Sequence, residues 1–421
     1  MAKVYKVAII GVGARGGDVY GQLVNNKKDQ FDIVALCDLR QERLDRFGEI
    51  FGVDKQNRFL DENEFFKEKR ADVVIIATPD NCHVRHALKA FEKGYDILCE
   101  KPLTCNKEEC QKLLAAQKKY GGKALVCHVL RYAPAFMKLH DIISSGEIGR
   151  LVAIDALERV GYGHQAHSYV RGNWRNTESA APMILAKCCH DLDLLQYYAN
   201  SKCKSISSVG ELTYFTSENA PEGAAKRCLD CKYADTCPYS ATYAYLKVWK
   251  DRGEPEDMWP FNVIATAPNT EEKLVNAIKD GPYGRCVYCC DNNVVDHQIT
   301  TMTFENGVKA SLTMTAFTAF GGRRIYFHGT LGEVVLDEHD NNIKLTKFGC
   351  QTVTYSLSDL IEKGYGHGGG DGGLINKLYD MLSGVAASET SLEASVESHL
   401  MGIAAEESRL EGGTLHFVHN N

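Results

Sequence analysis

The chain has 421 residues and a formal net charge of -7, a length that predicts two or three domains around a substantial core. It holds no block of basic residues, which argues against nucleic acid as a partner. It has no apolar run long enough to cross a bilayer, and its first residues show no cleavable signal pattern. We therefore expect a cytoplasmic protein with neither a membrane nor a nucleic-acid partner.

A glycine-rich turn lies within the first forty residues. It reads Gly11-Val12-Gly13-Ala14-Arg15-Gly16. Gly11 permits a tight turn, Gly13 lets the backbone approach a pyrophosphate, and Gly16 lets the next helix pack closely with its N-terminus toward the phosphates. A second apolar run, 33–37, ends in Asp38. A carboxylate there can bind both ribose hydroxyls and repels a 2′-phosphate, so the pattern predicts NAD(H) rather than NADP(H).

Residues 1–127 are expected to form a dinucleotide-binding domain of the Rossmann type, an α/β fold with a doubly wound parallel sheet. Short continuous apolar runs alternate with helical segments, as in buried parallel strands joined by helices. The expected strands are 6–10, 33–37, 72–77, 96–99 and 124–127. The expected helices lie near 42–51, 83–93 and 107–120. Ligands of such a sheet bind at the C-terminal ends of its strands.

In residues 128–421 the strand-like segments alternate between apolar and polar residues and are separated by turn signals. This pattern predicts an α+β domain on a mostly antiparallel open sheet, which we expect to serve substrate binding and oligomerisation. The expected strands are 151–157, 297–304, 309–315 and 325–328. A strongly periodic helix is expected over 182–198. The irregular stretch at about 214–292, which contains many Cys and Pro residues, is interpreted as an insertion.

Another informative motif is Glu100-Lys101-Pro102, at the end of the fourth expected strand. A lysine at this edge can approach both a nicotinamide and a substrate. Further markers accompany it: Thr78-Pro79 with His83, a helix bearing His190 and Asp193, and Gly329-Thr330-Leu331-Gly332. Together these motifs resemble the Gfo/Idh/MocA family, which includes glucose–fructose oxidoreductase and inositol dehydrogenases.

The resemblance implies an active site between a Rossmann domain and a mixed-sheet domain. It also implies homodimers or homotetramers that associate through the open sheet face. It makes Lys101 and His190 the catalytic pair, which act on a substrate hydroxyl while hydride leaves the carbinol carbon. The residues expected to bind NAD are Gly11, Gly13, Ala14, Arg15, Gly16, Asp38, Thr78, Pro79, His83, Glu100, Lys101 and His128.

The expected helix over 182–198 carries three polar residues spaced three apart. Lys187, His190 and Asp193 would share one helix face and form a candidate proton-transfer site. The alternative is an ordinary solvated face. Members of the family carry an Asp one turn before the histidine, but this chain has Ala186 there. Lys187 or Asp193 is therefore expected to take the place of that Asp in catalysis.

Two loops are candidates for substrate binding. The segment 164–176 combines hydrogen-bonding groups with a tryptophan, which suits the hydroxyls and the apolar C–H face of a polyhydroxylated ring. The segment 366–373 is rich in glycine, which permits close approach of the backbone to a ligand or movement of a lid. Ordinary loops without ligand contact are the alternative. The candidate substrate contacts are Tyr132, His164, Tyr169, Arg171, Trp174, Arg175, His367 and Asp371.

The chain has 16 cysteines, which are expected to stay reduced in a cytoplasmic protein. Cys228 and Cys231 at CxxC spacing, with Cys237 and Cys286, form a candidate tetrahedral zinc site that would fasten the insertion. Cys289 and Cys290 compete with Cys286 for the fourth place. Free thiols and an iron–sulfur cluster are the alternatives.

These features predict an NAD-dependent dehydrogenase that oxidises a secondary hydroxyl of a sugar, glycoside or cyclitol. The alternative is an NAD-dependent glycosidase or lyase, which oxidises the ring transiently, eliminates the aglycone and returns the hydride. A third possibility is a non-catalytic NAD-binding regulator, although a sensor needs neither Lys101 nor His190.

Overall fold

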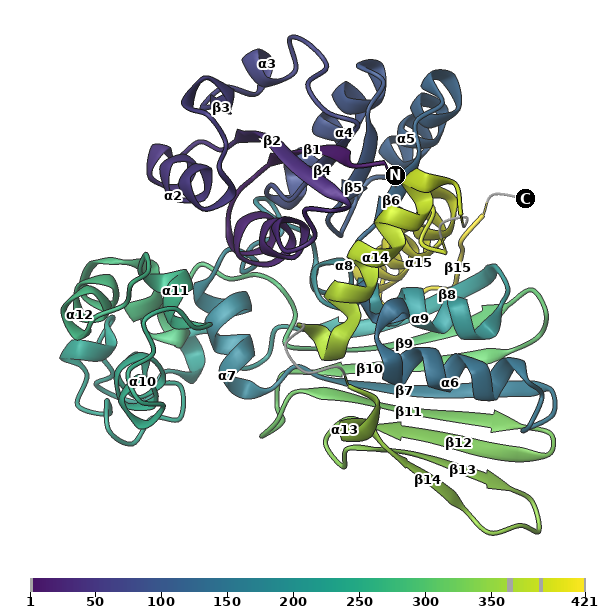
Figure 1. Ribbon diagram of the computed structural model, residues 1–421. Helices are drawn as coiled ribbons and strands as arrows, with labels where there is room; N and C mark the ends of the chain where they lie inside the picture. The colour runs from purple at the N-terminus through teal and green to yellow at the C-terminus, as the bar shows by residue number, and fades with distance from the viewer. Residues whose placement is uncertain (1–2, 362–365, 386–388, 420–421) are drawn as a thin grey trace.

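The computed structural model describes residues 3–361, 366–385 and 389–419. Its N-terminal part is a parallel six-stranded sheet in the order β3-β2-β1-β4-β5-β6 (Figure 1). The order reverses between β1 and β4, so a ligand crevice opens at the C-terminal ends of these strands. The strands are β1 (Tyr5–Ile10), β2 (Phe31–Cys37), β3 (Arg58–Phe59), β4 (Val73–Ile76), β5 (Asp96–Cys99) and β6 (Ala124–Val126). The helices are η1 (Ala14–Gly21), α1 (Gln22–Asn25), α2 (Gln41–Phe51), η2 (Lys55–Asn57), α3 (Glu62–Phe65), η3 (Asp80–Cys82), α4 (His83–Glu92) and α5 (Lys107–Tyr120).

The predicted strands and helices of this domain are confirmed to within about two residues at each end. The reason is burial: all four residues of β4 are buried, as are most of those in β1 and β2. Continuous apolar runs therefore mark these strands clearly. The two-residue strand β3 was not predicted, because it is too short to carry such a run.

The second sheet has nine strands in the order β14-β13-β12-β11-β7-β10-β9-β8-β15. Only β7 and β10 pair in parallel within it; the other neighbours are antiparallel, as predicted. The strands are β7 (Leu151–Arg159), β8 (Cys203–Glu211), β9 (His297–Phe304), β10 (Lys309–Thr315), β11 (Gly322–Gly329), β12 (Gly332–Asp337), β13 (Asn342–Lys347), β14 (Val353–Ser356) and β15 (His416–Phe417).

One face of the nine-stranded sheet is covered by helices, among them α6, α9 and α15 (Figure 1). The other face carries exposed apolar side chains, including Val152, Val209 and Ile299. The remaining elements of this part are η4 (Val129–Tyr132), α6 (Pro134–Ser144), α7 (Tyr162–His164), η5 (Gln165–Arg171), α8 (Met183–Ala186), α9 (Cys189–Ala199), α13 (Leu357–Leu360), η11 (His367–Gly369), α14 (Gly370–Ser383) and α15 (Leu392–Leu410). None of the helices described is long and apolar enough to span a bilayer.

Helix α14 connects the two parts of the molecule. Its residues Leu374, Ile375 and Leu378 are fully buried and share one core cluster with Val7 and Ile9 of β1. A segment from the C-terminal quarter of the chain therefore completes the core of the nucleotide-binding sheet. This arrangement holds the two sheets in a fixed relation and places the glycine-rich segment before α14 close to the strand ends.

The stretch at about 214–292, predicted to be an insertion and called the insertion below, lies between β8 and β9. It consists of short helices around three small cores, beside the N-terminal domain (Figure 1). Arg46 of α2 donates to Asp257 of the insertion at 2.9 Å. Its elements are η6 (Ser217–Asn219), η7 (Cys228–Asp230), η8 (Tyr243–Lys247), α10 (Val248–Asp251), α11 (Phe261–Ile264), α12 (Glu271–Asp280), η9 (Pro282–Gly284) and η10 (Val287–Cys289). The insertion thus borders the same side of the molecule as the strand ends.

Candidate active site

The glycine-rich turn after β1 leaves no room for side chains. Gly11 has φ +87°, and a Cβ there would lie 2.5 Å from the carbonyl oxygen of Ala77. A Cβ on Gly16 would lie 2.0 Å from the carbonyl oxygen of Gly11. The turn is therefore closed by backbone on both sides, and η1 starts directly at the end of the strand. This is the geometry that presents backbone N–H groups to a phosphate.

Asp38 follows β2 at the same edge of the sheet. Its carboxylate accepts hydrogen bonds from the backbone N–H groups of Val12 at 2.9 Å and Arg40 at 3.0 Å. Arg43 approaches it to 3.7 Å and lies beside Gly13. The carboxylate is thus fixed beside the glycine-rich turn by backbone hydrogen bonds.

Arg15 turns away from the expected phosphate position and joins two buried carboxylates. Its guanidinium donates to Glu100 and to Asp371, each at 2.7 Å, and lies over the ring of Tyr20. Burial raises the pKa of Glu100, but the charges of Arg15 and Lys101 outweigh burial and leave that pKa below its ordinary value. Arg15 therefore connects the nucleotide-binding turn to the catalytic strand end and to the start of α14.

The ends of β4 and β5 are held together by His83. Its two ring nitrogens lie 2.7 Å from the carbonyl oxygen of Pro102 and 2.8 Å from that of Thr78, and its side chain is fully buried. The neighbouring Asp80 was missed by the sequence analysis, although it directly follows Thr78-Pro79. One of its carboxylate oxygens is buried without a hydrogen-bond partner, and burial raises the pKa of Asp80 against the charges of His83 and Lys101.

Lys101 and His190 lie close enough for the charge of Lys101 to act on His190. The Lys101 ammonium donates to the carbonyl oxygen of Ala186, the last residue of α8, at 3.2 Å. His190 lies in the first turn of α9, and its Nδ1 is buried with no hydrogen-bond partner among the described residues. Burial, followed by the charge of Lys101, holds the pKa of His190 well below its ordinary range. His190 is therefore neutral at neutral pH.

The helix predicted over 182–198 is interrupted, which corrects the assumption that three polar residues share one of its faces. Helix α8 ends at Ala186 and α9 begins at Cys189, so Lys187 lies between them. Lys187 instead contacts Glu158 at 3.0 Å.

Behind Lys187 lies a buried network of charges that the sequence analysis did not detect. Arg323 lies 3.0 Å from Glu158 and donates to Asp191 at 2.8 Å. Burial raises the pKa of Asp191 to about 6. No motif reveals these contacts, because their members are far apart in sequence.

Asp193 has a different partner from the one expected. Both of its carboxylate oxygens accept hydrogen bonds from Arg131 at 2.7 Å, and the pair is buried. His128 lies 3.8 Å from Asp193, is 1 % exposed, and has its pKa lowered to about 4 by burial. Asp193 therefore stabilises the core behind His190, and His128 forms part of that core rather than of an open surface.

Some of the candidate substrate contacts do gather near Lys101. Burial, followed by the charge of Lys187, holds the pKa of His164 well below its ordinary range, and Lys101 contributes to that shift. The ring of His164 packs on Tyr169 and on Trp259 of the insertion. Trp174 lies near Asp80 and helps to lower the pKa of that carboxyl group against the effect of burial. These aromatic and polar groups border one region at the strand ends.

Other candidate substrate contacts are bound to structural partners elsewhere in the fold. The Tyr132 hydroxyl forms a hydrogen bond with Thr390, and Tyr132 packs in the core under α14. Arg175 forms a two-pronged ion pair with Asp291, at 2.8 and 3.1 Å. Arg171, at the end of η5, is 1 % exposed and binds residues of the insertion, as described below. Each of these three side chains has a structural partner that accounts for its position.

His367 and Asp371 lie together in the second glycine-rich segment. The Nδ1 of His367 is 2.9 Å from the Asp371 carboxylate. A Cβ on Gly366 would lie 2.4 Å from that same carboxylate, and a Cβ on Gly370 would lie 2.4 Å from the carbonyl oxygen of Val129. The glycines are therefore needed for close packing around Asp371 and η4. The ring of His367 lies 6.3 Å from that of His190.

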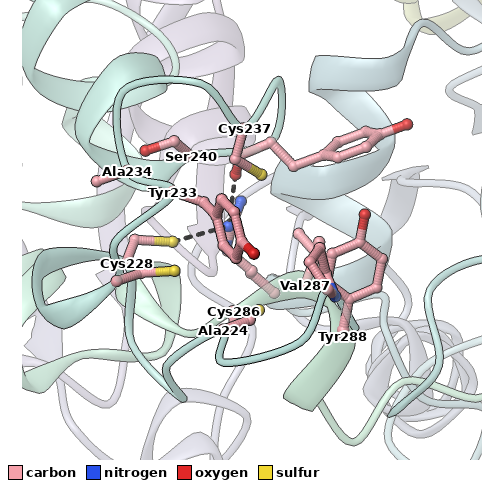
Figure 2. Close-up of a pocket in the computed structure, with 13 residues that line it drawn as sticks. Ala224, Cys228, Tyr233, Ala234, Cys237, Ser240, Cys286, Val287 and Tyr288 are labelled. Atoms are coloured by element: carbon pink, nitrogen blue, oxygen red, sulfur yellow. Dashed lines mark hydrogen bonds between the residues drawn. The ribbon is translucent and has the colours of Figure 1, made fainter. Parts of the chain in front are cut away.

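The four candidate zinc ligands line one pocket in the insertion; Figure 2 shows Cys228, Cys237 and Cys286 around it. The guanidinium of Arg171 lies among them. It donates to Cys228 Sγ at 3.5 Å and to the carbonyl oxygens of Tyr239 and Arg285, each at 2.7 Å. The described residues contain no set of three or more His, Cys, Asp or Glu that could hold a metal ion. The zinc prediction is therefore not supported, because the cation in this pocket is an arginine.

Comparison with known proteins decides the family. Residues 5–128 match the family described as "Oxidoreductase family, NAD-binding Rossmann fold", and residues 140–417 match its "C-terminal alpha/beta domain". The chain belongs to the Gfo/Idh/MocA family of oxidoreductases. The predicted resemblance is thus confirmed, and the family provides an NAD-binding domain and an oxidoreductase function.

Several known proteins are similar to this chain over part or most of its length. The putative oxidoreductase YteT of Bacillus subtilis (strain 168) is 23% identical over 397 residues, which are 88% of this chain and 89% of the relative. Inositol 2-dehydrogenase 1 of Paenarthrobacter aurescens (strain TC1) is 30% identical over 207 residues, only 49% of this chain and 57% of the relative. The structure of a levoglucosan dehydrogenase in complex with NADH and levoglucosan superposes with a TM-score of 0.70 at 18% identity and covers 99% of this chain and 100% of that chain. This last likeness bears on the fold alone.

Proposed function

We propose that the protein is an NAD-dependent dehydrogenase that oxidises a secondary hydroxyl of a sugar, glycoside or cyclitol. The observation that carries the proposal is that Lys101, directly after β5, donates to the carbonyl oxygen of Ala186 beside the helix of His190, and that its charge acts on His190. Ligands of such a sheet bind at the C-terminal ends of its strands, so we propose that the nicotinamide ring binds beside this pair. The inositol and levoglucosan dehydrogenases among the similar proteins support this class of substrate.

The residues present fit NAD. The closed backbone turn at Gly11 and Gly16 suits a pyrophosphate, and the carboxylate of Asp38 suits the two ribose hydroxyls. Thr78, Pro79 and Glu100 line the following strand ends, and His83 fixes their backbone. When bound, NAD supplies the hydride acceptor. Arg15 contributes to cofactor binding by positioning Glu100 and Asp371, because its guanidinium is paired with these two carboxylates.

The protein then supplies orientation and proton transfer. The ammonium of Lys101 is directed by the carbonyl oxygen of Ala186 and stabilises negative charge on the reacting oxygen. His190, which is neutral, accepts the hydroxyl proton. His164, Tyr169 and Trp174 provide an apolar ring face beside polar groups, a combination that suits a polyol.

A substrate screen tests this proposal. The purified protein is incubated with NAD and a panel of sugars, methyl glycosides and inositols, and the formation of NADH is followed at 340 nm. We expect stoichiometric NADH with at least one secondary alcohol, and none with primary alcohols of similar size. Absence of NADH with every member, despite demonstrated NAD binding, would reject the dehydrogenase.

The same experiment separates the glycosidase alternative. Aryl glycosides are supplied without added NAD, and aglycone release is measured together with NADH. Aglycone release without accumulation of NADH would replace the dehydrogenase with the redox-neutral reaction. Stoichiometric NADH with an intact glycosidic bond supports the proposal made here.

We also propose that the protein associates through the open face of the nine-stranded sheet. Val152, Val209 and Ile299 on this face are each about half exposed. Such a surface is typical of a contact between subunits. Light scattering is expected to give a dimer or tetramer, and Ile299→Lys to shift it toward the monomer. A monomeric wild-type protein would refute this arrangement.

A further inference from the structure

The reaction proposed above leaves a proton in a buried place. His190 is 8 % exposed, and both burial and the nearby charge of Lys101 oppose its protonation. A histidine in this position accepts the proton at a cost in free energy, and it must pass that proton on before it can act as a base again. Steady turnover therefore needs a second acceptor that lies next to His190 and reaches solvent.

Two histidine rings lie close to His190, and only one of them leads outward. The ring of His128 is 6.1 Å away, but His128 is 1 % exposed and its other neighbours are the buried Asp193 and His399. The ring of His367 is 6.3 Å away, and its side chain is 43% exposed. His128 thus leads into the core, whereas His367 connects the site with water.

The carboxylate beside His367 also orients its imidazole ring to accept a proton. The carboxylate of Asp371 lies 2.9 Å from its Nδ1, and Arg15 holds that carboxylate at 2.7 Å from the other side. Burial raises the pKa of Asp371, but the bonds from His367 and Arg15 bring it well below its ordinary range, so the carboxylate stays ionised. An ionised partner makes Nδ1 the donor and leaves Nε2 free to accept a proton.

The backbone confirms that this arrangement is specified by the fold. His367 itself has φ +50°, a left-handed conformation that costs energy for a residue other than glycine. Gly368 and Gly369 continue with φ +62° and +98°. Arg15 comes from the turn after β1, so two segments far apart in sequence meet to orient one imidazole.

We propose that His367, oriented by Asp371, passes the substrate's hydroxyl proton from His190 to solvent. In this step the substrate O–H bond breaks, and the proton moves to His190 as the hydride leaves with the electron pair of the C–H bond. The proton then moves to Nε2 of His367, across a distance that a water molecule can bridge, and finally to bulk water or buffer. The inference rests on the proposed dehydrogenase function.

A single-turnover experiment tests the relay. Enzyme saturated with NAD is mixed with the substrate found in the screen, in weak buffer with a pH indicator dye. NADH formation and proton release are recorded together. In the wild type both signals should rise at the same rate. In His367→Ala we expect proton release to lag at least about tenfold behind NADH formation, and added imidazole to restore it.

The matched control is His339→Ala, since His339 is exposed and lies in the turn between β12 and β13. It should leave both signals unchanged. Asp371→Asn should produce the same lag as His367→Ala, while NAD affinity measured by fluorescence stays within about twofold of the wild type.

Proton release that keeps pace with NADH in His367→Ala would overturn the relay. A higher KM with synchronous signals would make His367 a substrate contact instead. Failure of the wild type to form NADH from any polyol would reject the proposed dehydrogenase, which is a separate result from these.

Discussion

At the scale of single residues, the proposed function makes Asp38 the residue that selects the cofactor. Its carboxylate is held by the backbone N–H of Val12, and Arg43 lies 3.7 Å away. Asp38→Asn removes the charge that repels a 2′-phosphate and leaves Arg43 available to bind one. We expect NAD affinity to fall by about tenfold to a hundredfold, because a charged hydrogen bond contributes about 1.5–3 kcal/mol, and NADP affinity to rise.

The measurement is the quenching of protein fluorescence by each cofactor, and the ratio of the two dissociation constants is compared. Arg43→Ala added to Asp38→Asn should remove the gain in NADP affinity. A ratio that stays at the wild-type value in Asp38→Asn would contradict this account of specificity.

Lys101 is the residue on which the proposed chemistry depends. Lys101→Met retains the length of the side chain but removes the ammonium beside the reacting oxygen. We expect kcat to fall by about 10²–10⁴-fold, the range for a positioned proton-transfer or charged group, with NAD affinity within about twofold of the wild type. Stopped-flow measurement of NADH formation and a binding titration give the two values. Turnover within tenfold of the wild type would exclude this role.

At the scale of elements, Arg171 connects the end of η5 to the insertion. Its guanidinium donates to the carbonyl oxygens of Tyr239 and Arg285, and to the sulfur of Cys228. Arg171→Met leaves these buried acceptors without a donor, and each such loss costs about 1–3 kcal/mol. We expect the free energy of unfolding to fall by about 3 kcal/mol in a denaturant titration.

A matched control is available four residues away. Arg175→Met removes an ion pair with the half-exposed Asp291, and surface pairs contribute only about 0–1 kcal/mol. If the two substitutions destabilised the protein equally, Arg171 would not be the anchor of the insertion.

The same elements show how far the sequence predicts the structure. The strands of the first sheet other than β3 were predictable, because most of their residues are buried and each strand reads as an apolar run. The break at Lys187 was not, because an apolar periodicity continues across it and only the tertiary contact with Glu158 favours it. The same limit applies to Arg15 and Arg171. The sequence analysis named Arg15 as a cofactor contact and Arg171 as a substrate contact, whereas the structure pairs both with buried partners that are distant in sequence.

At the scale of the whole molecule, the domains are joined by polar as well as apolar contacts. Helix α14 completes the core of the first sheet, and Asp371 at its start binds Arg15 of the first turn. The proposed site therefore exists only when the N-terminal and C-terminal parts of the chain are assembled. Conditions that loosen this assembly should affect stability and catalysis together.

Acid is such a condition, because the molecule buries several neutral histidines. Burial lowers the pKa of His128 to about 4, and that of His167 and His399 to about 3, from the ordinary 6.5. Between those values the unfolded chain binds more protons than the folded one. The stabilisation is therefore complete above pH 6.5 and is lost as the pH falls, by up to about 1.4 kcal/mol per histidine and pH unit. Asp191, whose pKa is raised to about 6, opposes the effect as one group against several.

We expect the free energy of unfolding to decrease by at least about 2 kcal/mol from pH 6.5 to pH 5, measured by urea titration at each pH. His399→Gln should reduce this dependence by about one proton, since an amide can still accept from the backbone N–H of Leu103 and donate to the carbonyl of Ser395. The exposed His339 provides the control, and His339→Asn should leave the slope unchanged. Stability that is constant or rises on acidification would show that carboxylates such as Asp191, and not the buried histidines, dominate the response of the fold to pH.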